Sequence, residues 1–184
     1  MNNFKLEPGD IFATRGRGIT GWVSRKLMSP QTSRFHFGIL WKHLGEDDFL
    51  ILESISKGLA IGKLSWYEDQ DVEFYRVECD EDLRHAAPDG LIDWGRSRYD
   101  CWLIVKILFG AVVAFARILW KEHKVRKPRA EDLPYGVNLA LICTEAVDVA
   151  YDSVGVAIIP PGVIPIPSAF KAAQLEGRLT RLPV

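Results

Sequence analysis

Apolar and polar positions alternate along the chain around residues 34–41, in the stretch "RFHFGILW". Side chains on a strand point alternately to its two faces, so this stretch separates into two sets. One face carries Phe35, Phe37, Ile39 and Trp41, and the other carries His36, Gly38 and Leu40. A second run of strand type, "DFLILESI", follows the polar connection "KHLGEDD". The two runs together predict an antiparallel hairpin.

Three other short runs in the first half also predict strands: "GDIFAT" before the hairpin, and "GLAIGKL" and "VEFYRVE" after it. Between the first strand and the hairpin, "ITGWVSRKLM" predicts an amphipathic helix that ends before Pro30. After the last strand, "DEDLRHAAPDGLIDWGRS" predicts a helix with a break near Pro88 and Gly90. Because most strands come first and most helices later, the order favours an α+β fold over an alternating βαβ fold.

The run "CWLIVKILFGAVVAFARILW", residues 101–120, is close to the length that crosses a bilayer. Lys106 and Arg117 interrupt it and, at ~100° per residue, fall on nearly the same side of a helix. Charges at that depth argue against a membrane span. We expect a mostly buried helix with one wet edge. The alternative is a helix that lies on a membrane surface, with possible peripheral membrane contact through 101–120.

The last part of the chain contains "NLALICTEAVDVAYDSVG", which predicts a helix with Cys143 near its start and Gly155 after its end. Acidic residues in the early turns, Glu145 and Asp148, are typical of a helix N-terminus. A proline-rich extended segment follows, and the run "SAFKAAQLEGRL" predicts a short final helix.

Length and composition limit the classes of protein. With 184 residues and 48% apolar residues, the chain predicts a single domain, 1–184, with a sizeable core. Its 23 basic and 24 acidic residues give a net charge of −1, so we expect no nucleic-acid partner. The start "MNNFKLEPGD" lacks the pattern of a secretory signal peptide, which favours a cytoplasmic location. Three widely spaced cysteines argue against a disulfide framework and a zinc cluster.

Cys143 is a candidate nucleophile because a helix N-terminus favours the thiolate form of a cysteine. Backbone N–H groups at such a helix start also stabilise an oxyanion. The alternative is structural, since a lone cysteine in an apolar helix is usually a small buried hydrophobic residue.

His36 and Glu53 are the candidate partners of that thiol. A histidine in mid-strand, with Gly38 leaving space beside it, is an unusual choice for packing alone. Glu53 interrupts an apolar strand, where a buried carboxylate is unfavourable without a partner. If the hairpin pairs, Glu53 would hold the His36 ring as the third member of a triad holds its base. The alternatives are a packed histidine bonded to a carbonyl and a glutamate that faces water.

Four motifs carry a resemblance to a known superfamily: "GDIFATRG", "FHFGIL" followed by "ILES", "RYD" before a long helix, and "ICTEAVDVAYDSVG". Together they resemble the circularly permuted branch of the NlpC-like papain-fold superfamily, the YiiX-like amidases, with lecithin:retinol acyltransferase-like proteins as distant relatives. The resemblance implies a permuted papain-like fold, an antiparallel sheet with the nucleophile helix packed against it. It places the family's histidine on His36, its polar residue on Glu53 and its nucleophile on Cys143.

The chain departs from the family pattern at two positions. Phe35 stands where a small hydroxyl residue is common, and Thr144 replaces the serine after the nucleophile. The motif "RYDC" resembles the Tyr-Asp-Cys nucleophile of ordinary NlpC peptidases, but Trp102 follows where those enzymes have small residues. We therefore expect Cys101 to be non-catalytic, with Asp100 near the cap of the long helix. Cys79 has no activating neighbour in the sequence.

These observations predict a cysteine peptidase or amidase that cleaves an amide bond through a thioester, with the catalytic triad Cys143, His36 and Glu53 and no metal or organic cofactor. The resemblance implies a peptide, a peptidoglycan fragment or an N-acyl compound as substrate. Two alternatives remain. One is a membrane-associated thiol acyltransferase or lipid hydrolase that uses the same triad. The other is a noncatalytic binding module on the same fold.

Overall fold

The computed structural model describes residues 5–15, 28–45, 48–95, 101–122, 126–133 and 142–183. Within these residues, six strands form one antiparallel sheet, in the order β4-β3-β2-β1-β5-β6. The strands are β1 (Ile11–Arg15), β2 (Arg34–Gly45), β3 (Asp48–Ile55), β4 (Gly58–Lys63), β5 (Val72–Val77) and β6 (Leu179–Leu182). The expected α+β class is confirmed.

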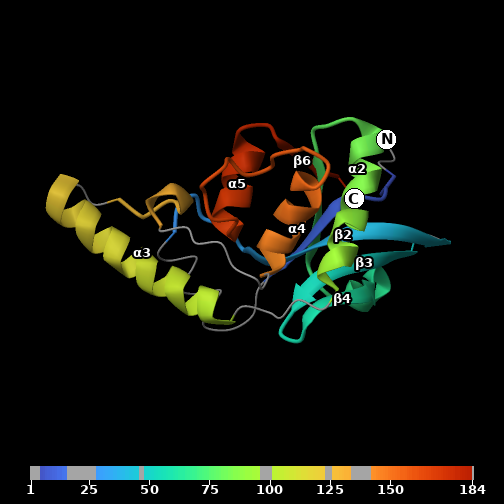
Figure 1. Cartoon of the computed structure of the whole chain (residues 1–184), viewed down its shortest axis with the longest axis horizontal. Helices are drawn as coiled ribbons and strands as arrows, with labels where there is room; N and C mark the ends of the chain where they lie inside the picture. Colours follow the sequence, from blue (N-terminus) through green and yellow to red (C-terminus); the bar gives the residue numbers. More distant parts are fainter. Residues whose placement is uncertain are drawn as a thin grey trace.

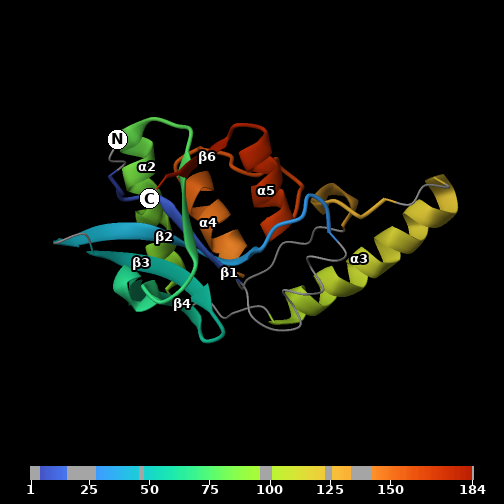
Figure 2. The same cartoon turned by 180° about the vertical axis from the view of Figure 1, so that it is seen from behind.

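The helical elements follow the first five strands in sequence, with one short exception between β4 and β5 (Figure 1). They are η1 (Leu64–Tyr67), α2 (Glu81–Ala86), η2 (Ala87–Trp94), α3 (Cys101–Glu122), η3 (Ala130–Asp132), α4 (Cys143–Asp152) and α5 (Pro167–Leu175). Helix α4 packs against β2, β3 and η2, and α5 packs against β2 and β6. Seen from behind, α4 and α5 lie together beside the sheet, whereas α3 reaches away from it (Figure 2).

The predicted hairpin is confirmed, and its two faces enter different hydrophobic clusters. Strands β2 and β3 pair antiparallel, with Gly38 opposite Glu53. Phe37 and Ile39 join the main core, which also contains buried side chains of α4 and α5. Leu40, from the opposite face, belongs to a second cluster with Phe12. The alternation in "RFHFGILW" therefore places apolar residues on both sides of a sheet that is covered on both faces.

Several boundaries differ from the sequence predictions. The chain does not finish with a helix: after α5, Leu179–Leu182 form the edge strand β6, which pairs with β5. This strand was missed because it is four residues long and its central residues, Thr180 and Arg181, are exposed. The predicted break near Pro88 is where α2 gives way to η2, and Pro88 lies in the first turn of η2. The predicted helix at 19–28 and the cap at Asp100 fall largely or wholly outside the described residues.

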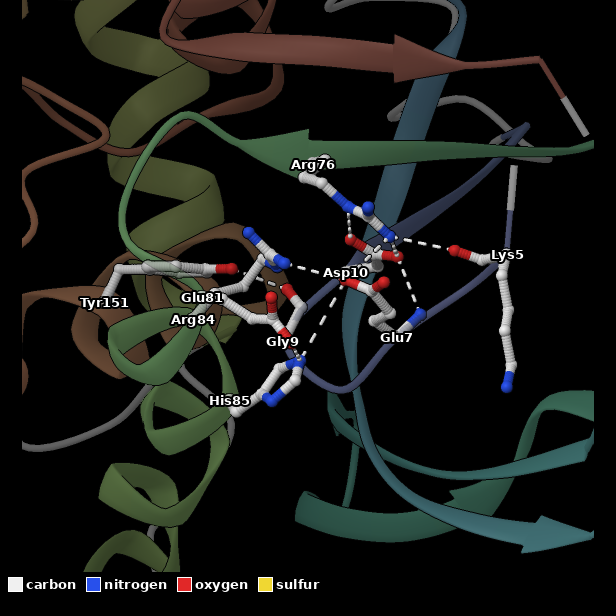
Figure 3. A network of polar contacts seen from close by, with 9 residues as sticks. All are labelled: Lys5, Glu7, Gly9, Asp10, Arg76, Glu81, Arg84, His85 and Tyr151. Carbon is white, nitrogen blue, oxygen red and sulfur yellow. Dashed lines mark hydrogen bonds and ion pairs between the residues drawn. The ribbon is translucent and has the colours of Figure 1, made fainter. Parts of the chain in front are cut away.

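A polar network fixes the N-terminal segment to the rest of the fold (Figure 3). Asp10 is fully buried and accepts hydrogen bonds from the Arg76 guanidinium at 2.8 and 2.7 Å. The Tyr151 hydroxyl of α4 donates to the Gly9 carbonyl at 2.6 Å. Gly9 has φ +87°, and a Cβ there would come within 2.1 Å of the Arg84 carbonyl oxygen. The motif "PGD" thus has a structural role, because it joins the start of β1 to β5, α2 and α4.

Helix α3 is less buried than its apolar sequence predicted. Gly110, Ala111, Ala114 and Ile118 are buried, but Phe109 and Trp120 are 71% and 84% exposed. The expectation of a mostly buried helix with one wet edge is therefore wrong for the side chains that the structure describes. In the described part of the chain, no helix combines the length and apolar character that crossing a bilayer requires.

Candidate functional site

His36 and Glu53 meet across the β2–β3 hairpin. His36 Nε2 lies 2.5 Å from Glu53 Oε2. The two residues are not directly opposite each other, since Glu53 pairs with Gly38, and the contact runs diagonally across the pair. Glu53 is 5% exposed, so its carboxylate depends on protein groups for hydrogen bonds. The predicted contact between these two side chains is present.

Cys143 is the first residue of α4 and brings the thiol to the same place. The N-cap residue Ile142 has extended backbone, and its N–H donates to Glu145 Oε2 at 3.4 Å, which completes the helix start. The Cys143 thiol lies 3.5 Å from the carbonyl oxygen of Phe35, the residue before His36. The thiol also lies close enough to His36 to raise the pKa of its ring. The structure therefore brings together Cys143, His36 and Glu53, three residues that lie far apart in the sequence.

The electrostatics of the cluster favour a charged imidazole. Burial of the His36 ring disfavours the imidazolium, but hydrogen bonds and charges from Cys143 and Glu53 outweigh it and raise the pKa to about 9. Nε2 faces Glu53, so the second ring nitrogen, Nδ1, is not engaged by that carboxylate. Near neutral pH the ring is thus an imidazolium, with both nitrogens protonated, which is the form that acts as a general acid.

Tyr67 is a member of the cluster that the sequence did not reveal. Its hydroxyl donates to Glu53 Oε2 at 2.5 Å and lies 3.3 Å from His36 Nε2. The Tyr67 and His36 rings stack, with centroids 6.1 Å apart. Burial and the bond to Glu53 raise the pKa of Tyr67, so it remains a hydrogen-bond donor. Tyr67 comes from the short η1 helix after β4, where nothing in the local pattern indicates a site.

Two glycines make room for these groups. A Cβ at Gly38 would lie 2.3 Å from Phe12 Cε1, so the space beside His36 is filled by the Phe12 ring. That ring packs against both His36 and Tyr67, with centroid distances of 6.2 and 5.0 Å. A Cβ at Gly62 would lie 3.1 Å from Glu53 Oε1. The unusual Gly38 noticed in the sequence thus admits an aromatic support for the site.

The two positions at which the chain departs from the pattern it resembles, Phe35 and Thr144, are both close to Cys143. Phe35 is half-buried and supplies the carbonyl that faces the Cys143 thiol, while Thr144, the residue after Cys143 in α4, is fully buried. Burial raises the pKa of the Cys79 thiol, which agrees with its predicted inactivity. Helix α3 begins at Cys101, but the side chain of Cys101 lies outside the described ones.

Within the described residues, no group of three or more His, Cys, Asp or Glu side chains is arranged to hold a metal ion. Comparison of the sequence with known proteins adds no assignment, since no protein-family model matches it and neither does any curated protein.

Proposed function

We propose that the protein is a cysteine hydrolase of permuted papain-like fold that cleaves amide bonds in peptides, peptidoglycan fragments or N-acyl compounds. The observation that carries the proposal is that His36 contacts the Glu53 carboxylate at 2.5 Å, while the Cys143 thiol, 3.5 Å from the carbonyl oxygen of the neighbouring Phe35, lies close enough to raise the pKa of the same ring. A thiol, an imidazole and a carboxylate in that order form the constellation of nucleophile, base and orienting group. The order along the chain, histidine before cysteine, and α4 packed against β2 and β3 support the permuted fold.

The reaction follows from the protonation state of the pair. The Cys143 thiolate attacks the substrate carbonyl carbon, and a carbon–sulfur bond forms. Backbone N–H groups at the start of α4 stabilise the resulting oxyanion. When the carbon–nitrogen bond breaks, the His36 imidazolium gives its proton to the departing amine. Neutral His36 then takes a proton from water, the water oxygen attacks the thioester, and the thiolate leaves.

Glu53 and Tyr67 act on the ring rather than on the substrate. Glu53 holds Nε2, so that the other nitrogen faces the thiol throughout the cycle. Tyr67 donates to the same carboxylate oxygen and thereby limits its movement. Both are positioning residues in this mechanism.

The first test is alkylation of the folded protein by iodoacetamide, with the products mapped to each cysteine by mass spectrometry. We expect Cys143 to react fastest near neutral pH, and a His36→Ala variant to lose that advantage because the imidazolium no longer stabilises the thiolate. Cys79 is the internal control, since burial raises its pKa. An inert Cys143, or one that reacts equally in His36→Ala, would leave a noncatalytic binding module as the better description.

The second test is turnover on a panel of N-acyl amides and cell-wall peptides. Cys143→Ala should abolish hydrolysis and keep the wild-type melting temperature, and Cys143→Ser is the matched variant that retains a hydroxyl. Retained hydrolysis in Cys143→Ala would refute the assignment of the nucleophile.

An acyltransferase or lipid hydrolase with the same triad is the second candidate. The apolar exposed side of α3 favours it, because this side would bring the protein to a lipid surface. An added amine acceptor and a phospholipid ester separate the candidates: transfer of the acyl group to the amine in preference to water supports the acyltransferase, hydrolysis of the phospholipid ester supports the lipid hydrolase, and hydrolysis of the amide substrates alone supports the amidase.

A further inference from the structure

Helix α3 exposes a continuous apolar stripe along one side. At ~100° per residue, Phe109, Val113, Ala116 and Trp120 follow one another along the helix at spacings typical of a single face. All four side chains are exposed. The exposed fraction is 49% for Val113, 71% for Phe109 and 84% for Trp120. Val112 and Leu119, 54% and 47% exposed, widen the stripe on one side. A soluble protein rarely leaves this much contiguous apolar surface uncovered, so the stripe indicates a binding surface.

The other edge of the stripe is basic. Lys106 and Arg117 are exposed and lie next to Val113 on the helix surface. The sequence from 101 to 120 contains no Ser, Thr, Asn, Gln, Asp or Glu. From 101 to 129 the basic residues are Lys106, Arg117, Lys121, Lys124, Arg126, Lys127 and Arg129, against the single acidic residue Glu122. Glu131 and Asp132 follow, and Asp132 pairs with Arg126 at 2.7 Å.

The position of α3 leaves the stripe accessible. Figures 1 and 2 show α3 reaching outward from the sheet and from α4 and α5. Its opposite side provides the buried residues Ala111, Ala114 and Ile118, of which the first two belong to the main core. With 22 residues, α3 is about 33 Å long, enough to lie along a flat surface.

We propose that α3 is an interfacial helix that docks the protein on an anionic phospholipid bilayer. The apolar stripe would enter the boundary between headgroups and acyl chains, with Trp120 and Phe109 as the main anchors. Lys106 and Arg117 would meet the negative headgroups. A second copy of the chain fits less well, because stripes pairing side by side bring basic edges of the same sign together. Among the described side chains on the exposed side of α3, only Lys106, Arg117 and the indole of Trp120 can form hydrogen bonds. This composition also favours lipid over a specific protein partner.

The experiment is co-sedimentation of the full chain with vesicles of phosphatidylcholine, with and without phosphatidylserine. We expect binding to the anionic vesicles at low salt, and weaker binding to pure phosphatidylcholine and at high salt. The double variant Phe109→Ser with Trp120→Ser should reduce the partition coefficient by about tenfold or more. Lys106→Gln and Arg117→Gln should each reduce it by about fivefold on anionic vesicles only. Because these side chains are exposed, the variants should keep the wild-type melting temperature.

Trp66→Ser is the matched control, since Trp66 is 66% exposed but lies on η1, away from α3. It should bind like the wild type. Cys143→Ala should also bind normally, so that failure of the proposed catalysis and failure of membrane docking are separate results. The proposal is overturned if the wild type does not bind anionic vesicles at low salt, or if Trp66→Ser weakens binding as much as the α3 variants. It is also overturned if the stripe instead holds two copies together, seen as a dimer that Trp120→Ser converts to a monomer without any vesicle binding.

Discussion

Replacement of Glu53 by glutamine should lower the pKa of His36 while leaving the fold intact. In the wild type, burial disfavours the imidazolium, and Cys143 and Glu53 together raise the pKa from 6.5 to about 9. This difference corresponds to about 3 kcal/mol of preference for the protonated ring in the folded protein. Glutamine keeps the size and one acceptor oxygen of Glu53 but removes the charge. We therefore expect the His36 pKa to move from about 9 back toward 6.5.

The same interaction makes the stability of the wild type depend on pH. Because the folded pKa is above the unfolded value, the stabilisation is complete below pH 6.5 and is lost as the pH rises through about 9. The free energy of unfolding should thus fall by up to about 3 kcal/mol across that window. Glu53→Gln should show a smaller fall. When Glu53→Gln is combined with Cys143→Ala, only burial remains, and the His36 pKa should drop below 6.5.

The assay is an NMR titration of the imidazole C–H signals, together with urea unfolding at a series of pH values. The chain has four histidines, so a His36→Gln variant assigns the signal. A wild-type His36 that titrates near 6.5, or a titration that Glu53→Gln leaves unchanged, would refute the charge pairing on which the proposed mechanism depends.

Three further predictions concern Tyr67 and Gly38 at the site and Asp148 farther along α4. Tyr67→Phe removes the hydrogen bond to the buried Glu53 and should cost about 1.5–3 kcal/mol in urea unfolding, with a larger effect on kcat than on KM if the bond positions the triad; an unchanged free energy of unfolding would show that the bond contributes nothing. Gly38→Ala should displace the Phe12 ring, which lies 2.3 Å from the added Cβ, and cost about 1–3 kcal/mol by overpacking; an unchanged melting temperature would contradict this geometry. Burial and neighbouring charge raise the pKa of Asp148 to about 7, so ionisation destabilises the fold as the pH rises from 3.8 through 7. Asp148→Asn should therefore stabilise the protein by up to about 4 kcal/mol at pH 8 and by little at pH 3.5, and equal effects at both pH values would contradict that origin.

The hairpin and its two faces could be predicted because strand geometry is local. Alternation along "RFHFGILW" is enough to place His36 and Gly38 on one face and Phe37 on the other, and the structure bears this out. A carboxylate in an apolar strand signalled a partner, since desolvation of Glu53 must be offset somewhere. The helix at Cys143 was likewise visible, because its acidic early turns and the glycine after its end are local features.

Other properties depend on residues that are distant in the sequence, and only the tertiary structure decided them. Tyr67 reaches Glu53 because the chain turns back through η1 after β4. A glycine is needed at position 38 because a side chain there would collide with the ring of Phe12 on the neighbouring strand. The apolar run in α3 predicted a helix, but hydrophobicity alone does not say which of its sides the rest of the chain covers. Local patterns of polarity set the secondary structure and the orientation of each side chain on its own element. Which faces meet, and therefore which thiol meets which imidazole, follows from long-range packing.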